Sequence, residues 1–175
     1  IKELEAGKII GMYNGRTEFG ARALGNRSIL ARPDLTNTVK KINEAVKNRD
    51  FWMPFAISIL KKHHKKFISN KKSLESPHMT LGFDTIKKNL KYIVSGTHPY
   101  DGTVRPQILE KNFNINYFKL IEKFYKKTKI PALLNTSLNL HGKPTVNNLQ
   151  QALYTLMNSK LDSLIINYKY IIKKR

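Results

Sequence analysis

The stretch 15–33, GRTEFGARALGNRSILARP, combines glycines with fixed positive charge. Glycine lets a backbone turn at positive φ and come close to a ligand, and guanidinium groups grip phosphate or carboxylate with two hydrogen bonds. This chemistry suits anion binding. Outside a helix, however, a spacing of five or six residues cannot place all the arginines on one face, so a surface hairpin with solvated arginines is an equal alternative. The basic residues are Arg16, Arg22, Arg27 and Arg32, and Glu18 is the one acidic residue.

A second basic motif occurs in VKNRDFWMPF, residues 46–55. Lys47 and Arg49 stand two apart at the end of a predicted helix, so both can point into one cleft if the chain there is extended. A rigid apolar wall beside them would lower the local dielectric and strengthen anion binding. The alternative is that the wall is ordinary core and the two charges are its polar edge. The wall residues are Phe51, Trp52, Pro54 and Phe55.

Small polar side chains follow a predicted buried strand in LLNTSLNLHGKP, residues 133–144. Hydroxyl and amide groups at a strand end can bond phosphate oxygens or a nucleotide ring, and Gly142 permits the turn beyond them. Turn chemistry alone would also explain such a cluster. The polar residues are Asn135, Thr136, Ser137 and Asn139.

Several other kinds of site are absent from the sequence. There is no cysteine, which excludes disulfides, thiolate metal sites and a cysteine nucleophile, and which favours an intracellular, cytoplasmic setting. The five histidines show no H-x-x-x-H or H-E-x-x-H pairing, so no metal ligand is predicted. No Walker loop, Ser-His-Asp order or G-x-G-x-x-G occurs either.

The net charge predicts an anionic partner. There are 32 Lys and Arg against 12 Asp and Glu, a balance of +20. Much of this charge lies in lysine-rich pieces that suit a lysine-biased proteome, and we attribute about half of the excess to that background. Nucleic acid, a phosphorylated small molecule and an anionic membrane surface would all be attracted. No apolar run approaches the roughly 20 residues that cross a bilayer. Because the chain opens on Ile1 within a helix-like pattern, we expect it to be part of a longer protein.

Alternating strand and helix patterns must position these motifs. We expect a single mixed α/β domain over residues 1–175, with a sheet flanked by helices and the motifs at strand ends. A helix over 115–128 would carry Tyr117, Phe118, Ile121, Phe124 and Tyr125 on one face. A helix capped by Thr36 precedes residue 48, and a surface helix with a mobile loop is expected over 61–76. Another helix is predicted at 148–159, with strands at 8–13, 27–31, 55–60, 78–86, 103–109, 130–137 and 162–173.

Four segments together resemble the C-terminal part of the NodU/CmcH/TobZ-type O-carbamoyltransferases. They are EFGARALGNRSILARP, INEAVKNRDFWMPFAISIL, DGTVRPQIL and LLNTSLNLHGKPTV, in this order, and the similarity runs from about Gly11 to the last strand. The chain departs from the family pattern at three positions: Ala21 replaces a proline, Met53 an arginine and Leu138 a phenylalanine.

The resemblance implies a fold and a half-reaction. It implies a YrdC/Sua5-like domain with a twisted mixed sheet, which joins carbamoyl phosphate and ATP into carbamoyl adenylate. A Kae1-like, ASKHA-type N-terminal domain of the same protein would hold a metal and transfer the carbamoyl group to a hydroxyl of a natural product or sugar.

The resemblance also implies roles for the residues singled out above. Arg22, Lys47 and Arg49 would act at the carbamoyl-phosphate end and be catalytic by neutralising charge. Mg²⁺ would be held mainly by the nucleotide. Arg16 and Arg32 are expected to be solvated flanks. The residues expected to face ATP are Arg27, Ser28, Arg105, Asn135, Thr136, Ser137 and Asn139.

Two alternatives remain open at this point. The charge, together with the RNA association of some YrdC relatives, suggests a nucleic-acid-binding module, which would need exposed aromatics between basic residues. The aromatics at 117–125 and 51–55 instead have the pattern of core. A closer alternative is synthesis of threonylcarbamoyl adenylate for tRNA modification.

Overall fold

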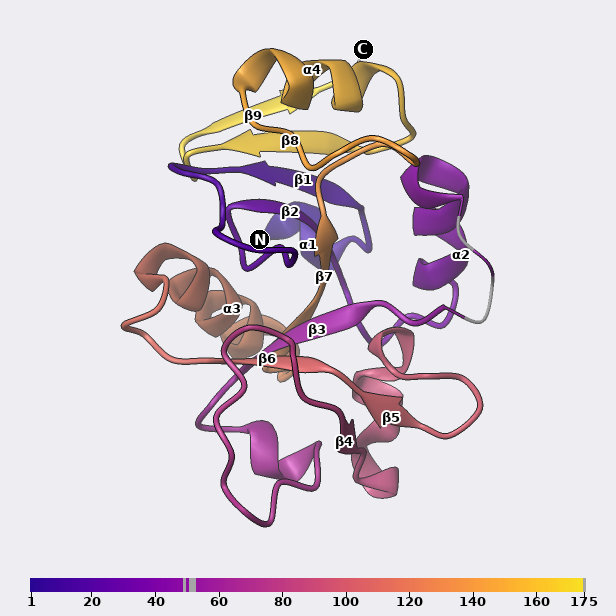
Figure 1. Ribbon diagram of the computed structural model, residues 1–175, viewed down its shortest axis with the longest axis vertical. Coiled ribbons are helices and arrows are strands. Elements are labelled where there is room, and N and C mark those ends of the chain that lie inside the picture. The colour runs from indigo at the N-terminus through magenta and orange to yellow at the C-terminus, as the bar shows by residue number, and fades with distance from the viewer. Residues whose placement is uncertain (49, 51–52, 175) are drawn as a thin grey trace.

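A seven-stranded mixed sheet forms the centre of the protein (Figure 1). The strand order is β6-β3-β7-β2-β1-β8-β9, in which β1 with β8 and β3 with β6 are parallel and the other neighbours antiparallel. This computed structural model describes residues 1–48, 50 and 53–174. The strands are β1 (Ile10–Tyr13), β2 (Arg27–Ala31), β3 (Ala56–Leu60), β6 (Pro106–Leu109), β7 (Ala132–Ser137), β8 (Ser163–Ile166) and β9 (Tyr170–Lys173).

Helices cover both faces of the sheet because successive strand side chains point to opposite sides. Leu30 packs with Tyr117 and Ile121 of α3, whereas Ile29 and Ala31 join a second cluster that includes residues of α2 and α4. None of the helices formed by the described residues combines the length and apolar character needed to cross a bilayer. The helices are α1 (Lys2–Glu5), α2 (Thr38–Ile42), α3 (Ile115–Thr128) and α4 (Leu149–Met157).

The helix predicted over 115–128 is confirmed. The residues at its two ends explain where it begins and where it stops. The side chain of Asn114 accepts a hydrogen bond from the N–H of Tyr117, which satisfies one of the free donors of the first turn. Lys129 then takes a left-handed conformation, with φ of 63°, and ends the helix. Ile121 and Phe124 are fully buried, as the apolar periodicity requires.

A smaller layer lies against β3 and β6, at the bottom of Figure 1. Two short antiparallel strands, β4 (Phe83–Asp84) and β5 (Thr103–Val104), form it together with 3₁₀ turns. Their apolar side chains pack on Ile57 and Ile59 of β3. The 3₁₀ turns span His64–Lys66, Lys87–Tyr92 and Val94–Gly96.

Three expectations about local structure were wrong. The strand predicted over 78–86 is limited to Phe83–Asp84. In place of a surface helix over 61–76 there is one 3₁₀ turn and a loop, which the side chain of Asn70 closes by bonding both backbone groups of Leu74. The second helix begins at Thr38 after Asn37, with no side-chain cap, so Thr36 does not cap it.

We predict that Gly25→Ala destabilises the fold. Gly25 has φ of 112°, which side-chain-bearing residues rarely adopt, and a Cβ at this position would overlap the ring of Tyr117. Strain and overpacking together should lower the free energy of unfolding by about 2 kcal/mol or more. Urea unfolding measures this, with Gly82→Ala as the control because nothing lies within 4 Å of a Cβ there. Equal stability of the two variants would contradict the prediction.

Candidate active site

Lys47 and the polar turn after β7 form one hydrogen-bonded cluster. Lys47 ends a π-helical turn (Asn43–Lys47) and is 2% exposed. Its Nζ donates to the carbonyl of Ser137 at 2.6 Å, to Ser137 Oγ at 3.2 Å and to Asn139 Oδ1 at 2.5 Å. These oxygens fix the position of the ammonium group. The structure thus brings together three of the predicted site residues.

The second basic residue of this motif is not placed. Arg49, Phe51 and Trp52 lie outside the residues that the structure describes, so their predicted roles stay predictions. The extended chain assumed at Lys47 was wrong, because Lys47 is in a helical turn and Asn48 is left-handed, with φ of 44°.

The glycine and arginine loop between β1 and β2 is organised by Glu18. Its Oε1 accepts hydrogen bonds from the backbone N–H groups of Leu24 at 2.7 Å, Asn26 at 2.8 Å and Arg27 at 3.1 Å. A carboxylate bonded by several backbone donors is a strong local tie. Glu18 therefore shapes the loop from inside, a role that the sequence analysis missed because it noted Glu18 only as the one acidic residue of the stretch.

Arg27 and Ser28 lie inside the protein. Arg27 is 2% exposed, donates to the carbonyls of Asn14 at 2.7 Å and Gly15 at 2.9 Å, and stacks over Tyr13 at 3.7 Å. Ser28 is fully buried and its Oγ accepts from the N–H of Gly25. In this arrangement Arg27 holds the loop closed, and the predicted contact of both residues with ATP stays untested.

The two arginines expected to be solvated flanks differ from each other. Arg16 is exposed. Arg32, in contrast, is half-buried and pairs with Asp34 through two hydrogen bonds of 2.9 and 2.6 Å, and it also donates to the carbonyl of Glu5. The expectation for Arg32 was therefore wrong: its guanidinium ties α1 to the chain after β2.

A small pocket of about 90 Å³ gathers most of the remaining predicted residues. Arg22 comes from the loop and Arg105 from the segment between β5 and β6, and both are exposed at this pocket. Its space equals that of about three water molecules, which suits one phosphoryl or carbamoyl-sized group. The lining residues are Ala21, Arg22, Ala23, Pro54, Phe55, Ala56, Met79, Arg105, Asn135, Thr136 and Ser137.

A buried polar network joins this pocket to the sheet. Asn135 Nδ2 donates to the carbonyl of Ala23 at 3.1 Å and to Ser58 Oγ at 3.0 Å, and Ser58 Oγ donates to Gln107 Oε1 at 2.7 Å. These three side chains come from neighbouring strands and are at most 2% exposed. Asn135 thereby fixes the backbone next to Arg22. Sequence reasoning found Asn135 but missed Ser58 and Gln107, whose partners are far away along the chain.

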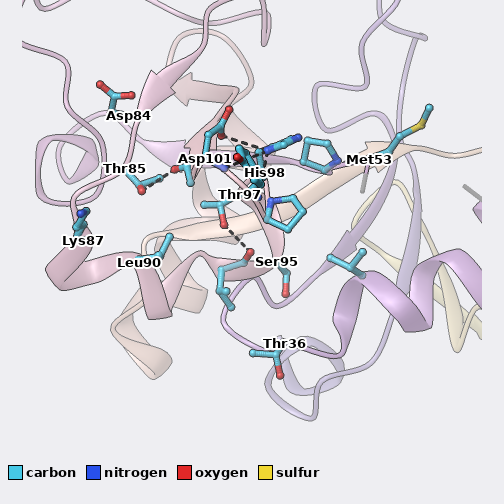
Figure 2. Close-up of a pocket in the computed structure, with 16 residues that line it drawn as sticks. Thr36, Met53, Asp84, Thr85, Lys87, Leu90, Ser95, Thr97, His98 and Asp101 are labelled. Atoms are coloured by element: carbon cyan, nitrogen blue, oxygen red, sulfur yellow. Dashed lines mark hydrogen bonds and ion pairs between the residues drawn. The ribbon is translucent and has the colours of Figure 1, made fainter. Parts of the chain in front are cut away.

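A larger cavity of about 760 Å³ adjoins the small pocket, and Pro54 lines both. Figure 2 shows Met53 on the side of this cavity opposite Thr85 and Lys87. No site residue was predicted from the sequence in the segment 98–102 that lines this cavity. The walls are Thr36, Val39, Met53, Pro54, Asp84, Thr85, Lys87, Leu90, Val94, Ser95, Thr97, His98, Pro99, Tyr100, Asp101 and Gly102.

A histidine and an aspartate lie close together in the wall of the larger cavity. His98 Nδ1 and Asp101 Oδ1 are 3.3 Å apart (Figure 2). Hydrogen bonds from the backbone N–H and the hydroxyl of Thr103 hold the pKa of Asp101 below its usual range. Asp101 is therefore a carboxylate at neutral pH, able to accept hydrogen bonds.

We predict that Glu18→Ala loosens the loop that carries Arg22. Without the carboxylate, three backbone N–H groups lose their acceptor, and their amide hydrogens should exchange at least about tenfold faster. Hydrogen-exchange NMR at Leu24, Asn26 and Arg27 measures this. Glu44→Ala is the control, since Glu44 is an exposed partner of Lys40 at 3.8 Å. Unchanged exchange at all three amides would contradict the prediction.

Known structures share the fold of this chain. HypF in its phosphate- and nucleotide-bound form superposes with a TM-score of 0.62 at 17% identity over 94% of this chain and 22% of HypF. A P. abyssi Sua5 variant superposes with a TM-score of 0.59 at 15% identity over 99% of this chain and 54% of that one. Since both neighbours contain YrdC-like domains, the predicted fold is confirmed.

Sequence relatives include carbamoyltransferases and nodulation proteins. The chain is 39% identical to nodulation protein NolNO of Sinorhizobium fredii, over 97% of this chain and 25% of that protein. It is 32% identical to a 3'-hydroxymethylcephem-O-carbamoyltransferase of Streptomyces clavuligerus, over 83% of this chain and 27% of the enzyme. Residues 1–174 match the family described as Carbamoyltransferase C-terminus. The chain therefore belongs to the carbamoyltransferase C-terminal domain family.

Proposed function

We propose that this domain binds ATP and carbamoyl phosphate and forms carbamoyl adenylate. The observation that carries the proposal is the small pocket in which Arg22 and Arg105, from separate segments, meet the polar end of β7. Two guanidinium groups beside hydroxyl and amide groups suit a phosphorylated ligand. Membership of the family supports the carbamoyl chemistry, and the similar fold of HypF, whose structure holds phosphate and nucleotide, supports the choice of ligands.

The chemistry needs charge neutralisation and alignment more than a protein nucleophile. Water releases phosphate from carbamoyl phosphate and leaves carbamate. A carbamate oxygen then attacks the α-phosphorus of ATP, the bond to the β-phosphate oxygen breaks, and pyrophosphate leaves. The two substrates bring about six negative charges together, whose repulsion costs several kcal/mol unless cations are fixed nearby.

The named residues supply these cations in different ways. Arg22 and Arg105 are exposed at the pocket and can contact substrate directly. Lys47 is held by Ser137 and Asn139 and would contribute a preorganised positive charge at the same strand end. Mg²⁺ would neutralise the phosphates further. No group of three or more His, Asp or Glu side chains that could hold a metal ion occurs in the described part of the chain, so its ligands would come mainly from the nucleotide.

Transfer of the carbamoyl group would take place outside this domain. The chain spans between 25% and 31% of the length of the first four relatives. In our proposal a metal-bearing, Kae1-like N-terminal domain of the same protein takes carbamoyl adenylate and carbamoylates a hydroxyl of a natural product or sugar. The name of the cephem O-carbamoyltransferase, which describes transfer to a hydroxymethyl group, supports this division.

The charge of +20 alone does not favour a nucleic-acid-binding function. Such a module needs aromatic side chains exposed for stacking. Tyr117, Phe124 and Phe55 are at most 3% exposed, whereas Phe19, Tyr100 and Tyr170 are exposed. Burial of aromatics therefore does not separate the two functions, and our preference rests on membership of the family. Because the chain belongs to a carbamoyltransferase family, we also prefer carbamoyl over threonylcarbamoyl as the activated group.

We predict that the chain releases pyrophosphate when ATP, Mg²⁺ and carbamoyl phosphate are all present. Omitting carbamoyl phosphate should abolish the release, because carbamate is the attacking group. A coupled pyrophosphate assay and calorimetry with ATP measure turnover and binding separately. If calorimetry detects no binding of millimolar ATP with Mg²⁺, the proposed function fails.

A second prediction concerns the two exposed arginines of the loop. Arg22→Ala should lower kcat/KM for carbamoyl phosphate by at least about tenfold, because it removes a charge-assisted hydrogen bond. Arg16→Ala is the matched control, since Arg16 lies in the same loop but not in the pocket. The same loss in both variants, or in neither, would place the carbamoyl-phosphate site elsewhere. Both side chains are exposed, so neither change should impair folding.

A further inference from the structure

The outer face of α3 carries a row of like charges. Lys119, Lys123 and Lys127 recur every fourth residue, Lys126 lies beside them, and all four side chains are exposed. At a helical rise of about 1.5 Å per residue, the row is about 12 Å long. Like charges four residues apart weaken a helix. The row therefore has a cost in the isolated chain that an anionic partner would remove.

No nearby acidic side chain offsets these lysines. Residues 111–129 hold six lysines and a single acidic residue, Glu122. In the part of the chain that the structure describes, none of these six lysines forms an ion pair. A lysine-biased composition explains why lysines are numerous, but it does not explain why they gather on one face without acids.

A second group of lysines continues the same surface. The ring of His63, in the turn after β3, lies 4.3 Å from the ring of Tyr125 near the end of α3. Burial lowers the pKa of His63, and the charges of Lys62 and Lys66 lower it further. The potential at this end of the helix is therefore positive. The exposed lysines of the turn are Lys62, Lys65 and Lys66. Together with the four lysines of α3 they form what we call the lysine face.

The lysine face lies away from the candidate active site. None of its residues lines the small pocket or the larger cavity. In Figure 1, α3 is on the left of the sheet, whereas α2 and β5 are on the right. A partner bound to this face would therefore leave the pocket at Arg22 accessible.

The composition of the lysine face favours a lipid surface over a nucleic acid. All its basic residues are lysines, whereas arginine is the usual residue for reading base edges and stacking on bases. No ring is free for stacking between the lysines, because all four aromatic side chains of α3 pack against the core. Clusters of four to eight basic residues on an amphipathic helix are typical of binding to anionic lipids.

Two apolar side chains stand at one end of the row. Phe113 is 47% exposed and Ile115 is 39% exposed. Ile115 begins α3 and lies four residues before Lys119, so it continues the line of lysines toward the N-terminal end of the helix. Exposed apolar side chains next to a basic helix face can enter the headgroup region of a bilayer.

We propose that the lysine face binds an anionic membrane surface, with α3 lying along it. Each lysine held near such a surface raises the affinity roughly fivefold. Phe113 and Ile115 add apolar contact at the N-terminal end of the helix. The inference does not depend on the proposed function, because it uses a different surface of the molecule.

The test compares two variants of the full chain that have the same net charge. One variant combines four changes on α3: Lys119→Gln, Lys123→Gln, Lys126→Gln and Lys127→Gln. The control combines four changes at exposed lysines of other segments: Lys40→Gln, Lys41→Gln, Lys88→Gln and Lys160→Gln. Co-sedimentation at low ionic strength with vesicles of equal parts phosphatidylserine and phosphatidylcholine measures binding, and pure phosphatidylcholine vesicles are the reference.

Thermal unfolding followed by circular dichroism checks that both variants fold. The changes on α3 relieve like-charge repulsion, so they should not destabilise the helix. Should the fourfold variant fail to fold, Lys123→Gln alone replaces it, with Lys41→Gln as its control.

We expect the wild-type chain to bind the mixed vesicles and not the pure phosphatidylcholine vesicles. The α3 variant should bind at least about tenfold more weakly, and the control should stay within about threefold of wild type. A wild-type chain that does not bind the mixed vesicles, or equal losses in the two variants, would overturn the proposal. Tighter binding of a single-stranded RNA, with the same dependence on the α3 lysines, would overturn it in favour of a nucleic acid.

Discussion

The register of β7 between β2 and β3 determines where the candidate site forms. β7 is antiparallel to both neighbours, and Asn135 stands opposite Leu30 on β2 and Ala56 on β3. Leu133 and Leu134 enter different core clusters, one on each face of the sheet. A slip of one residue would exchange these faces, so burial strongly specifies the register. The polar residues at the end of the strand emerge at one place for this reason.

The loop that carries Arg22 is then held from two sides. Glu18 binds its backbone from within, and Asn135 binds the carbonyl of Ala23 from the sheet. Arg27 adds a third tie by bonding the carbonyls at the start of the loop. A loop fixed in this way presents its exposed guanidinium in a set position, and fixed charges stabilise a developing negative charge without reorganisation.

Local patterns in the sequence predicted much of the fold. The predicted bounds of the strand Arg27–Ala31 and the helix Ile115–Thr128 were correct. Both elements are defined by apolar residues that recur over a short range of the sequence. The expected helix over 61–76 was wrong because specific contacts outweigh helix propensity there. His64 is 6% exposed and its Nδ1 donates to the carbonyl of Lys61, and the side chain of Asn70 closes the loop. Intrinsic helix propensity is small and is readily overridden by such contacts.

The sequence motifs identified residues that line the small pocket, but they did not indicate which side chains point into it and which are buried. Arg22, Arg105 and the polar end of β7 meet as their motifs suggested. Arg27 belongs to the same motif yet turns inward, because backbone carbonyls and Tyr13 lie within its reach. The network through Ser58 and Gln107 joins residues 49 and 77 positions apart, a distance that no local pattern encodes.

One contact described above also limits how the sequence can change. The ring of Tyr117 fills the space where a side chain at Gly25 would begin, and the φ of 112° there excludes most other residues even if the ring were removed. A smaller residue at 117 would open a cavity in the core cluster under α3 without freeing position 25. Position 25 is therefore restricted twice, by its own backbone conformation and by a ring from a helix that begins 90 residues later in the chain.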